Sequence, residues 1–149
     1  DRMVLAAGAT LMYPNQNKLI IDAGTCITYD FVNAENQYLG GAISPGIKIR
    51  YKSLNNYTSK LPLLTLSEDF EIIGNSTKSA IHSGVINGVI FEIEGFISQY
   101  SLKNQDLTII LTGGDAEFLA KRLKSTIFAN SNFLLESLNI LSLYTEKND

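Results

Sequence analysis

The sequence predicts a single α/β domain built on a mixed sheet, with an antiparallel meander of three strands and flanking helices. Two observations carry this prediction. First, three strand-like segments near the N-terminus are joined by short turns, a pattern typical of an antiparallel meander. Second, a long helical repeat is followed by a short apolar strand, a Gly-Gly turn and another helix, which indicates a further strand outside the meander. The 149 residues are enough for one ordinary domain.

Hydrophobic periodicity and turn residues divide the first half of the chain into a helix, three strands and a second helix. Asp1 is a suitable N-cap for a helix from Arg2 to Met12, which the turn at 13–17 ends. An uninterrupted apolar run is typical of a strand buried on both faces, and polar–apolar alternation indicates a strand buried on one face. These patterns predict strands over 19–22, 27–31 and 37–44, a loop over 33–36 and, after the break at Pro45-Gly46, a helix to about residue 57.

The second half is dominated by one long helix. Apolar residues recur every four positions from Ile81 to Ile97, which predicts a helix from Ser76 or Thr77 to about Tyr100. Gly84 and Gly88 inside this helix each cost about 1 kcal/mol relative to Ala. We therefore expect close packing against the glycine face, in part by a second subunit. The other predicted elements are a loop over 61–69 with room for a short strand, a buried strand over 107–111, a helix from 115 or 116 to about 124, and a helix over 133–144 before a frayed polar tail.

Composition excludes several classes of protein. At 45% hydrophobic and 18% charged residues the chain can bury a core, and its net charge of −3 gives no electrostatic footprint for nucleic acid. No apolar run approaches the length of a membrane span, and residues 1–15 lack the order of a signal peptide. One cysteine, Cys26, excludes an internal disulfide and is expected to be a small buried residue. We expect a cytoplasmic protein that binds neither nucleic acid nor membrane.

The turn Asp22-Ala23-Gly24-Thr25 is the first candidate site. Gly24 allows the backbone to approach a ligand closely, and backbone N–H groups with the Thr25 hydroxyl can donate to phosphate oxygens. Asp22 can hold a cation that neutralises phosphate charge. The competing interpretation is an ordinary hairpin with a tight turn.

The turn Thr112-Gly113-Gly114-Asp115 is the second candidate site. It joins a buried strand to the start of a helix, which is the geometry of an anion or nucleotide site. The competing interpretation is a close-packed turn in which Asp115 caps the helix.

The order of these elements resembles one half of the duplicated ribonuclease-H-like fold of sugar kinases, actin and Hsp70 proteins. Across nearly its whole length the sequence more closely resembles the type III pantothenate kinases. Five motifs carry the resemblance: Asp1-Arg2, Asp22-Ala23-Gly24-Thr25, Gly40-Gly41-Ala42-Ile43-Ser44-Pro45-Gly46, residues 74–81 with Gly84 and Gly88, and Thr112-Gly113-Gly114-Asp115. The resemblance implies an actin-like ATPase domain that phosphorylates pantothenate with ATP, the first step toward coenzyme A. It also implies Mg²⁺ with the ATP, a monovalent cation (K⁺ or NH₄⁺) and a homodimer.

The resemblance also assigns roles to residues. It makes Asp1 the catalytic carboxylate that accepts the substrate hydroxyl proton, and it places Arg2 and Thr77 on pantothenate. The residue types alone would make Asp1 an N-cap, Arg2 a solvated helix residue and Thr77 part of a helix cap. The remaining assignments are Gly24 and Thr25 at the phosphates, Gly113 and Gly114 at the nucleotide, Asp22 at the monovalent cation, and Gly41, Pro45 and Gly46 in the pocket wall. Apart from the resemblance, we expect His82 to be a surface or interface residue rather than a base, and Asp30 and Asp115 are the next-best acids.

The sequence departs from the family in one respect. The N-terminal half of these kinases opens with an Asp-x-Gly-Asn-Thr phosphate loop, and this chain contains no such stretch. We therefore expect the 149 residues to be the C-terminal half of a two-domain kinase, inactive or nearly so by itself. Two other functions stay open: a non-catalytic accessory factor in transcription, and another kinase or ATPase of the superfamily with a different acceptor.

Overall fold

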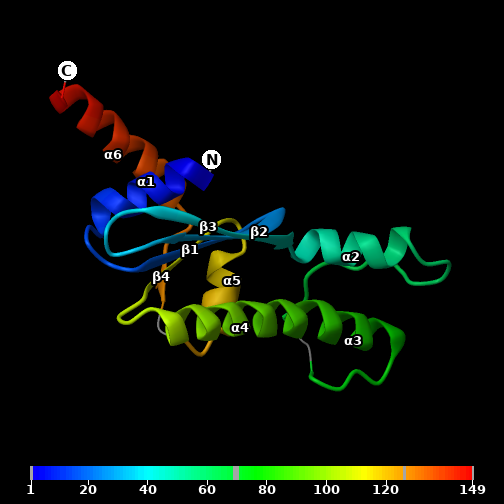
Figure 1. The fold of residues 1–149 in the computed structure, drawn as a ribbon. Helices are drawn as coiled ribbons and strands as arrows, with labels where there is room; N and C mark the ends of the chain where they lie inside the picture. The colour runs from blue at the N-terminus through cyan, green and yellow to red at the C-terminus, as the bar shows by residue number, and fades with distance from the viewer. Residues whose placement is uncertain (1, 69–70, 126, 149) are drawn as a thin grey trace.

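The computed structural model describes residues 2–68, 71–125 and 127–148. These residues form one five-stranded sheet between two layers of helices, with α1 and α6 on one face and α4 and α5 on the other (Figure 1). The elements are α1 (Arg2–Met12), β1 (Lys18–Ala23), β2 (Cys26–Val32), β3 (Tyr38–Pro45), α2 (Ile47–Asn56), α3 (Thr77–His82), the π-helical segment η1 (Ser83–Asn87), α4 (Gly88–Lys103), β4 (Thr108–Thr112), α5 (Ala116–Ala120), β5 (Phe128–Ala129) and α6 (Phe133–Asn148).

The sheet is mixed and has the order β3-β2-β1-β4-β5. Strands β1, β2 and β3 form the predicted antiparallel meander, and β4 lies parallel to β1 with Asp22 opposite Thr112. Because β1 and β4 are parallel neighbours, their carboxyl ends meet at one edge of the sheet. The two glycine turns follow these two strands directly.

Strand β1 is buried on both faces, which explains its unbroken apolar run. Leu19 and Ile21 belong to the larger core, under α4 and α5, whereas Ile20 belongs to the smaller core under α1 and α6. All three side chains have 0% exposure. The sheet therefore holds the loop after Asp22 on a rigid strand.

The long helix forms as predicted but contains a π-helical turn. Segments α3, η1 and α4 follow one another without a break, from Thr77 to Lys103. Within η1 the Ser83 hydroxyl donates to the carbonyl of Ile72 at 2.6 Å, and the Asn87 amide donates to Ser83. These bonds fix the segment that precedes the helix against the wider turn.

The glycine face of this helix is not covered by the described part of the chain. A Cβ atom added at Gly84 would have no heavy atom within 4 Å, and one at Gly88 would meet only Nη1 of Arg50, at 3.7 Å. The expectation of close packing at these glycines is therefore wrong within this chain.

By length and composition alone, the helix Thr77–Lys103 could cross a membrane. This differs from the expectation that no apolar run approaches the length of a membrane span. However, Val89, Ile93 and Ile97 pack into the core against the sheet, and 39% of the most apolar window is buried. A core helix passes the same test, so this finding is weak support for a membrane span.

Several local expectations need correction. Cys26 is exposed because it begins β2 at the open end of the sheet, opposite Pro45. Helix α5 stops at Ala120, where the Arg122 side chain donates to the carbonyl of Phe118. Helix α6 continues to Asn148, since the side chains of Thr145 and Asn148 bond to carbonyls in its last turns. The short strand β5 was not predicted, and residues 61–68 form no strand.

Candidate active site

The two glycine turns meet at the carboxyl ends of β1 and β4. The backbone N–H of Asp115 donates to the carbonyl of Ala23 at 3.0 Å. Gly113 has a φ of +99°, and a Cβ atom there would lie 2.5 Å from both the Ala23 carbonyl oxygen and Oδ1 of Asp22. Only glycine fits this position, because any side chain would push the second turn away from the Asp22 carboxylate.

The Pro45-Gly46 turn lies against the first glycine turn. The N–H of Gly46 donates to the Thr25 carbonyl at 2.9 Å. A Cβ atom on Gly46 would lie 2.1 Å from the carbonyl oxygen of Gly24 and 2.4 Å from that of Thr25. This turn therefore fixes the shape of the Gly24-Thr25 loop, although neither Pro45 nor Gly46 lines the cavity beside that loop.

The Asp22 carboxylate is half-buried between these turns. Burial raises its pKa, and the negative charge of Asp30 raises it further. Thr28 lies opposite Asp22 on β2, and its hydroxyl is buried without a hydrogen-bond partner among the described residues. A carboxylate beside an unpaired hydroxyl oxygen fits a hard cation, which prefers oxygen ligands.

The sequence analysis missed Thr28, although the pairing that follows from a tight turn after Asp22 would have placed it there. In the described ranges, no group of three or more His, Cys, Asp or Glu side chains is close enough to hold a metal ion. A cation at this position would therefore use one carboxylate and neutral oxygen atoms.

A cavity of about 320 Å³ opens beside the Gly24-Thr25 loop. Lys48 and Lys52, one turn apart on α2, provide positive charge at its wall, and Asp115 also lines it. Burial raises the pKa of Asp115, while the charge of Lys48 lowers it. The other lining residues are Gly24, Thr25, Ile47, Tyr51, Leu63, Leu64, Thr65 and Leu66. Apolar walls with two cations at a glycine turn suit a ligand that has an apolar body and phosphate groups.

Asp115 occupies the N-cap position of α5 but does not cap it. Its side chain makes no hydrogen bond to the first turn of that helix. The simpler interpretation of this residue, as an N-cap, is therefore wrong for the side chain. Neighbouring Gly114 has no heavy atom within 4 Å of an added Cβ, so its backbone is open to a ligand.

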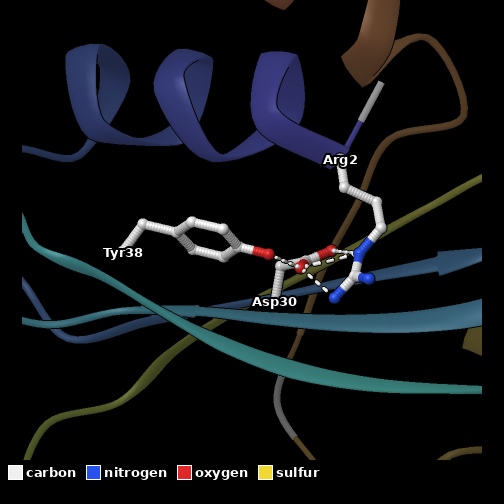
Figure 2. Close-up of polar contacts among 3 residues, drawn as sticks. All are labelled: Arg2, Asp30 and Tyr38. Carbon is white, nitrogen blue, oxygen red and sulfur yellow. Dashed lines mark hydrogen bonds and ion pairs between the residues drawn. The ribbon is translucent and has the colours of Figure 1, made fainter.

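Arg2, Asp30 and Tyr38 form a polar cluster on the α1 face of the sheet (Figure 2). Nε of Arg2 donates to Oδ1 and Oδ2 of Asp30 at 3.0 and 3.2 Å, and Nη2 donates to Oδ1 at 2.7 Å. The Tyr38 hydroxyl donates to Oδ1 at 2.5 Å. The hydrogen bond to Asp30 raises the pKa of both Arg2 and Tyr38.

This cluster changes the interpretation of two residues. The Asp30 side chain is 0% exposed, so this next-best acid cannot reach a substrate. Arg2 is ion-paired rather than solvated. In the register of the sheet Asp30 lies opposite Ile20, two residues before Asp22, so the cluster and the cation position share one face. Asp1, the expected catalytic carboxylate, lies outside the described residues.

Thr77 lies apart from these groups. It is the first residue of α3, and the preceding Ser76 caps that helix by accepting from the N–H of Ser79 at 3.1 Å. Thr77 lines a separate hollow of about 440 Å³ together with Leu54, Leu61, Ala80, Ile81 and Gly84. The described chain therefore does not bring Thr77 to Asp22 or Thr25.

Glu92 on α4 joins several elements beneath the loop. Its Oε2 accepts from Tyr29 at 3.2 Å, from Ser44 at 2.9 Å and from Nη2 of Arg50 at 2.8 Å. Nε of Arg50 also donates to the Pro45 carbonyl at 2.8 Å. Burial, with the charge of Glu92, raises the pKa of Tyr29. Nothing in the local sequence pointed to this network, which anchors the Pro45-Gly46 turn to the long helix.

His82 contacts the wall of the cavity. Its Nδ1 lies 2.7 Å from the hydroxyl of Tyr51, and burial raises the pKa of that tyrosine to about 12. The histidine is half-buried rather than a free surface group. It thus connects the end of α3 to α2.

Comparison with known proteins identifies the family. The profile of the type III pantothenate kinases matches residues 1–99. The chain belongs to this family. It is 64% identical over all 149 residues to a type III pantothenate kinase of Flavobacterium johnsoniae, of which it covers 61%. It is 65% identical over 144 residues, 97% of its length, to one of Flavobacterium psychrophilum, of which it covers 60%. The chain thus spans about three fifths of the length of the curated relatives it matches.

Solved structures confirm the predicted actin-like ATPase fold. A protein of Campylobacter jejuni described as a Baf family transcriptional activator superposes with a TM-score of 0.69 at 22% identity, over 97% of this chain and 65% of that one. The ethanolamine utilization protein EutJ of Carboxydothermus hydrogenoformans gives 0.52 at 19% identity, over 92% and 51%. At these identities the likeness concerns the fold alone.

Proposed function

We propose that the chain is the C-terminal half of a two-domain type III pantothenate kinase, which phosphorylates pantothenate with ATP in the first step of coenzyme A biosynthesis. One observation carries the proposal: in a chain of this family, the turns at Asp22–Thr25 and Thr112–Asp115 meet beside a cavity with two lysines. Pantothenate is proposed as the substrate because the relatives are named type III pantothenate kinases.

The reaction needs positioning and charge stabilisation more than covalent chemistry. Backbone N–H groups of Gly24 and Thr25, with the Thr25 hydroxyl, would hold phosphate oxygens. Gly113 and Gly114 would border the nucleotide. Asp22, with the unpaired hydroxyl of Thr28, would hold a monovalent cation, and ATP would arrive with Mg²⁺; these cations offset the charge of the phosphates.

The acceptor side of the site would use Asp1, Arg2 and Thr77, although Thr77 lies apart in a separate hollow of the described chain. We assign Asp1 as the base that accepts the substrate hydroxyl proton, as the family resemblance implies, and in the sequence it immediately precedes Arg2. Arg2 and Thr77 would bind pantothenate through its oxygen atoms. The rest of the phosphate clamp, the Asp-x-Gly-Asn-Thr loop, is absent from these 149 residues. The isolated chain should therefore show no pantothenate-dependent ATP turnover.

A homodimer through the long helix belongs to the same proposal. Gly84 and Gly95 have no heavy atom within 4 Å of an added Cβ, and Phe91 between them is 61% exposed. Phe91 and Gly95 lie one turn apart on α4 and share a face. Light scattering of the full-length protein should give a dimer mass, and Gly84→Trp should give a monomer. A wild-type monomer at micromolar concentration would contradict the dimer.

The deciding experiment is ATP-dependent phosphorylation of pantothenate by the full-length protein, with and without potassium. Product that depends on potassium is the expected result. Folded protein that forms no product in either condition would favour the non-catalytic accessory factor, and product from another alcohol in an acceptor screen would favour a different kinase. We place the protein in the cytoplasm, with neither nucleic acid nor membrane as a partner.

A further inference from the structure

We propose that Asp30 and Tyr38 are positioning residues that orient the Arg2 guanidinium, so that its remaining edge contacts an oxygen atom of the phosphoryl acceptor. This inference rests on the proposed function, because it adds two residues to the acceptor side of that site. Neither residue touches substrate itself. Both act through Arg2.

The first argument is the geometry of the guanidinium. Asp30 engages Nε and Nη2, which form one edge of the fork. Nη1 has no hydrogen bond to any described residue, and Figure 2 shows the third nitrogen turned away from the carboxylate. The Arg2 side chain is 34% exposed, so this edge is accessible. A planar guanidinium held along one edge presents its other donors in a fixed direction.

The second argument is the rigidity of the support. The carboxylate has no exposed surface and stands on β2, between two neighbouring strands of the sheet. Tyr38, from β3, donates to Oδ1, the oxygen that also accepts from Nη2. This second donor prevents rotation of the carboxylate about its own axis. The orientation of Arg2 is thereby set by two strands rather than by a flexible surface side chain.

The third argument is location. Arg2 begins α1 directly after Asp1 in the sequence, and Asp30 lies on the same face of the sheet as Asp22. A substrate group bound by Arg2 would therefore lie at the face of the sheet that also carries the proposed cation site.

The test is steady-state kinetics of the full-length protein with pantothenate and with ATP varied separately. Arg2→Ala should raise the KM for pantothenate tenfold or more. Asp30→Asn should raise the same KM at least fivefold and leave the KM for ATP unchanged. Because Asp30 acts through Arg2, the double variant should have the KM of Arg2→Ala alone. Glu68→Gln, which removes an exposed ion pair with Arg122, is the control and should change neither constant.

Tyr38→Phe keeps the ion pair between Arg2 and Asp30. It therefore tests the inference even if Asp30→Asn does not fold. It should raise the KM for pantothenate two- to fivefold with an unchanged KM for ATP. Wild-type KM values in both Asp30→Asn and Tyr38→Phe, with a raised KM in Arg2→Ala, would overturn the inference and leave the proposed function intact. A wild-type KM in Arg2→Ala would overturn it as well. Failure of the proposed function would instead appear as absence of product from the wild-type protein.

Discussion

Asp30 and Glu92 serve opposite faces of the same two strands, and each collects three donor groups on one carboxylate. Asp30 belongs to β2, has no exposed side-chain surface and holds the start of α1. Glu92 belongs to α4, is 22% exposed and holds Arg50 and the Pro45-Gly46 turn. The same chemistry thus orders the proposed acceptor side of the site from the sheet, and the proposed phosphate side from a helix.

The difference matters because each carboxylate should affect the Michaelis constant for a different substrate. Asp30 acts on the residue proposed to bind pantothenate, whereas Glu92 acts on the loop proposed to bind ATP. Variants of the two faces should therefore separate the two Michaelis constants. Four predictions test this division, in order of decreasing effect.

Asp1→Asn should have the largest effect, because it removes the proposed base from the acceptor side. We expect kcat of the full-length protein to fall by about 10² to 10⁴, or about 3 to 5 kcal/mol of barrier. Single-turnover measurement of phosphopantothenate formation would check this. A wild-type rate would remove Asp1 from the chemistry.

Gly46→Ala should directly disturb the Gly24-Thr25 loop, which we propose binds phosphate. The added Cβ would lie 2.1 Å from the Gly24 carbonyl oxygen, and backbone oxygen cannot move aside cheaply. Gly46 has a φ of −72°, so the loss would report the clash rather than backbone strain. We expect a loss of about 1–3 kcal/mol in the free energy of unfolding and a raised KM for ATP.

Pro45→Ala is the matched control for this prediction. It changes the same turn without adding an atom over the loop, and it should leave the KM for ATP near wild type. Equal effects of the two variants would show that the loss does not come from the clash of the added methyl group. Chemical denaturation and ATP titration give the two readouts.

Glu92→Gln should sharpen the comparison. The variant keeps an acceptor oxygen but loses the charge that holds Arg50, so we expect about 1–2 kcal/mol less stability. The KM for ATP should rise severalfold while that for pantothenate stays constant, the reverse of Asp30→Asn. If both variants raised the same constant, the division between the two faces would be wrong.

Tyr51 gives the smallest effect at neutral pH, because its contribution to stability changes only at alkaline pH. Burial raises its pKa to about 12, so between pH 10 and 12 the unfolded state loses this proton first. The folded state then binds more protons than the unfolded state, and stability falls as pH rises. Each pH unit in this window should cost about 1.4 kcal/mol. The unfolding free energy of Tyr51→Phe should fall less steeply; parallel curves would contradict the assignment.

The parts of this architecture that were predictable from sequence depend on neighbouring residues. The apolar run before Asp22, the short turns of the meander and the repeat from Ile81 to Ile97 each report their own element. Each glycine turn was predicted from its own residues, whereas the parallel pairing of β1 with β4 that brings the two turns together joins segments far apart in the sequence.

The rest depends on contacts between distant segments. Glu92 meets Tyr29 and Arg50, which are 63 and 42 residues away in the sequence. Asp30 meets Arg2 across 28 residues. No periodicity encodes such pairs. Cys26 was wrongly expected to be buried for a related reason: its exposure depends on where the sheet ends, not on the residues beside it.

The π-helical turn at Ser83–Asn87 divides the long helix into two parts with different phase. Such a turn contains one residue more than an α-helical turn, and one residue corresponds to about 100° of rotation around the axis. Loss of a single residue there would therefore rotate Thr77 by that angle relative to α4 while the core contacts of α4 stayed in place. In evolutionary terms, an insertion or deletion at this wide turn can change the orientation of α3 without changing the packing of α4 in the core.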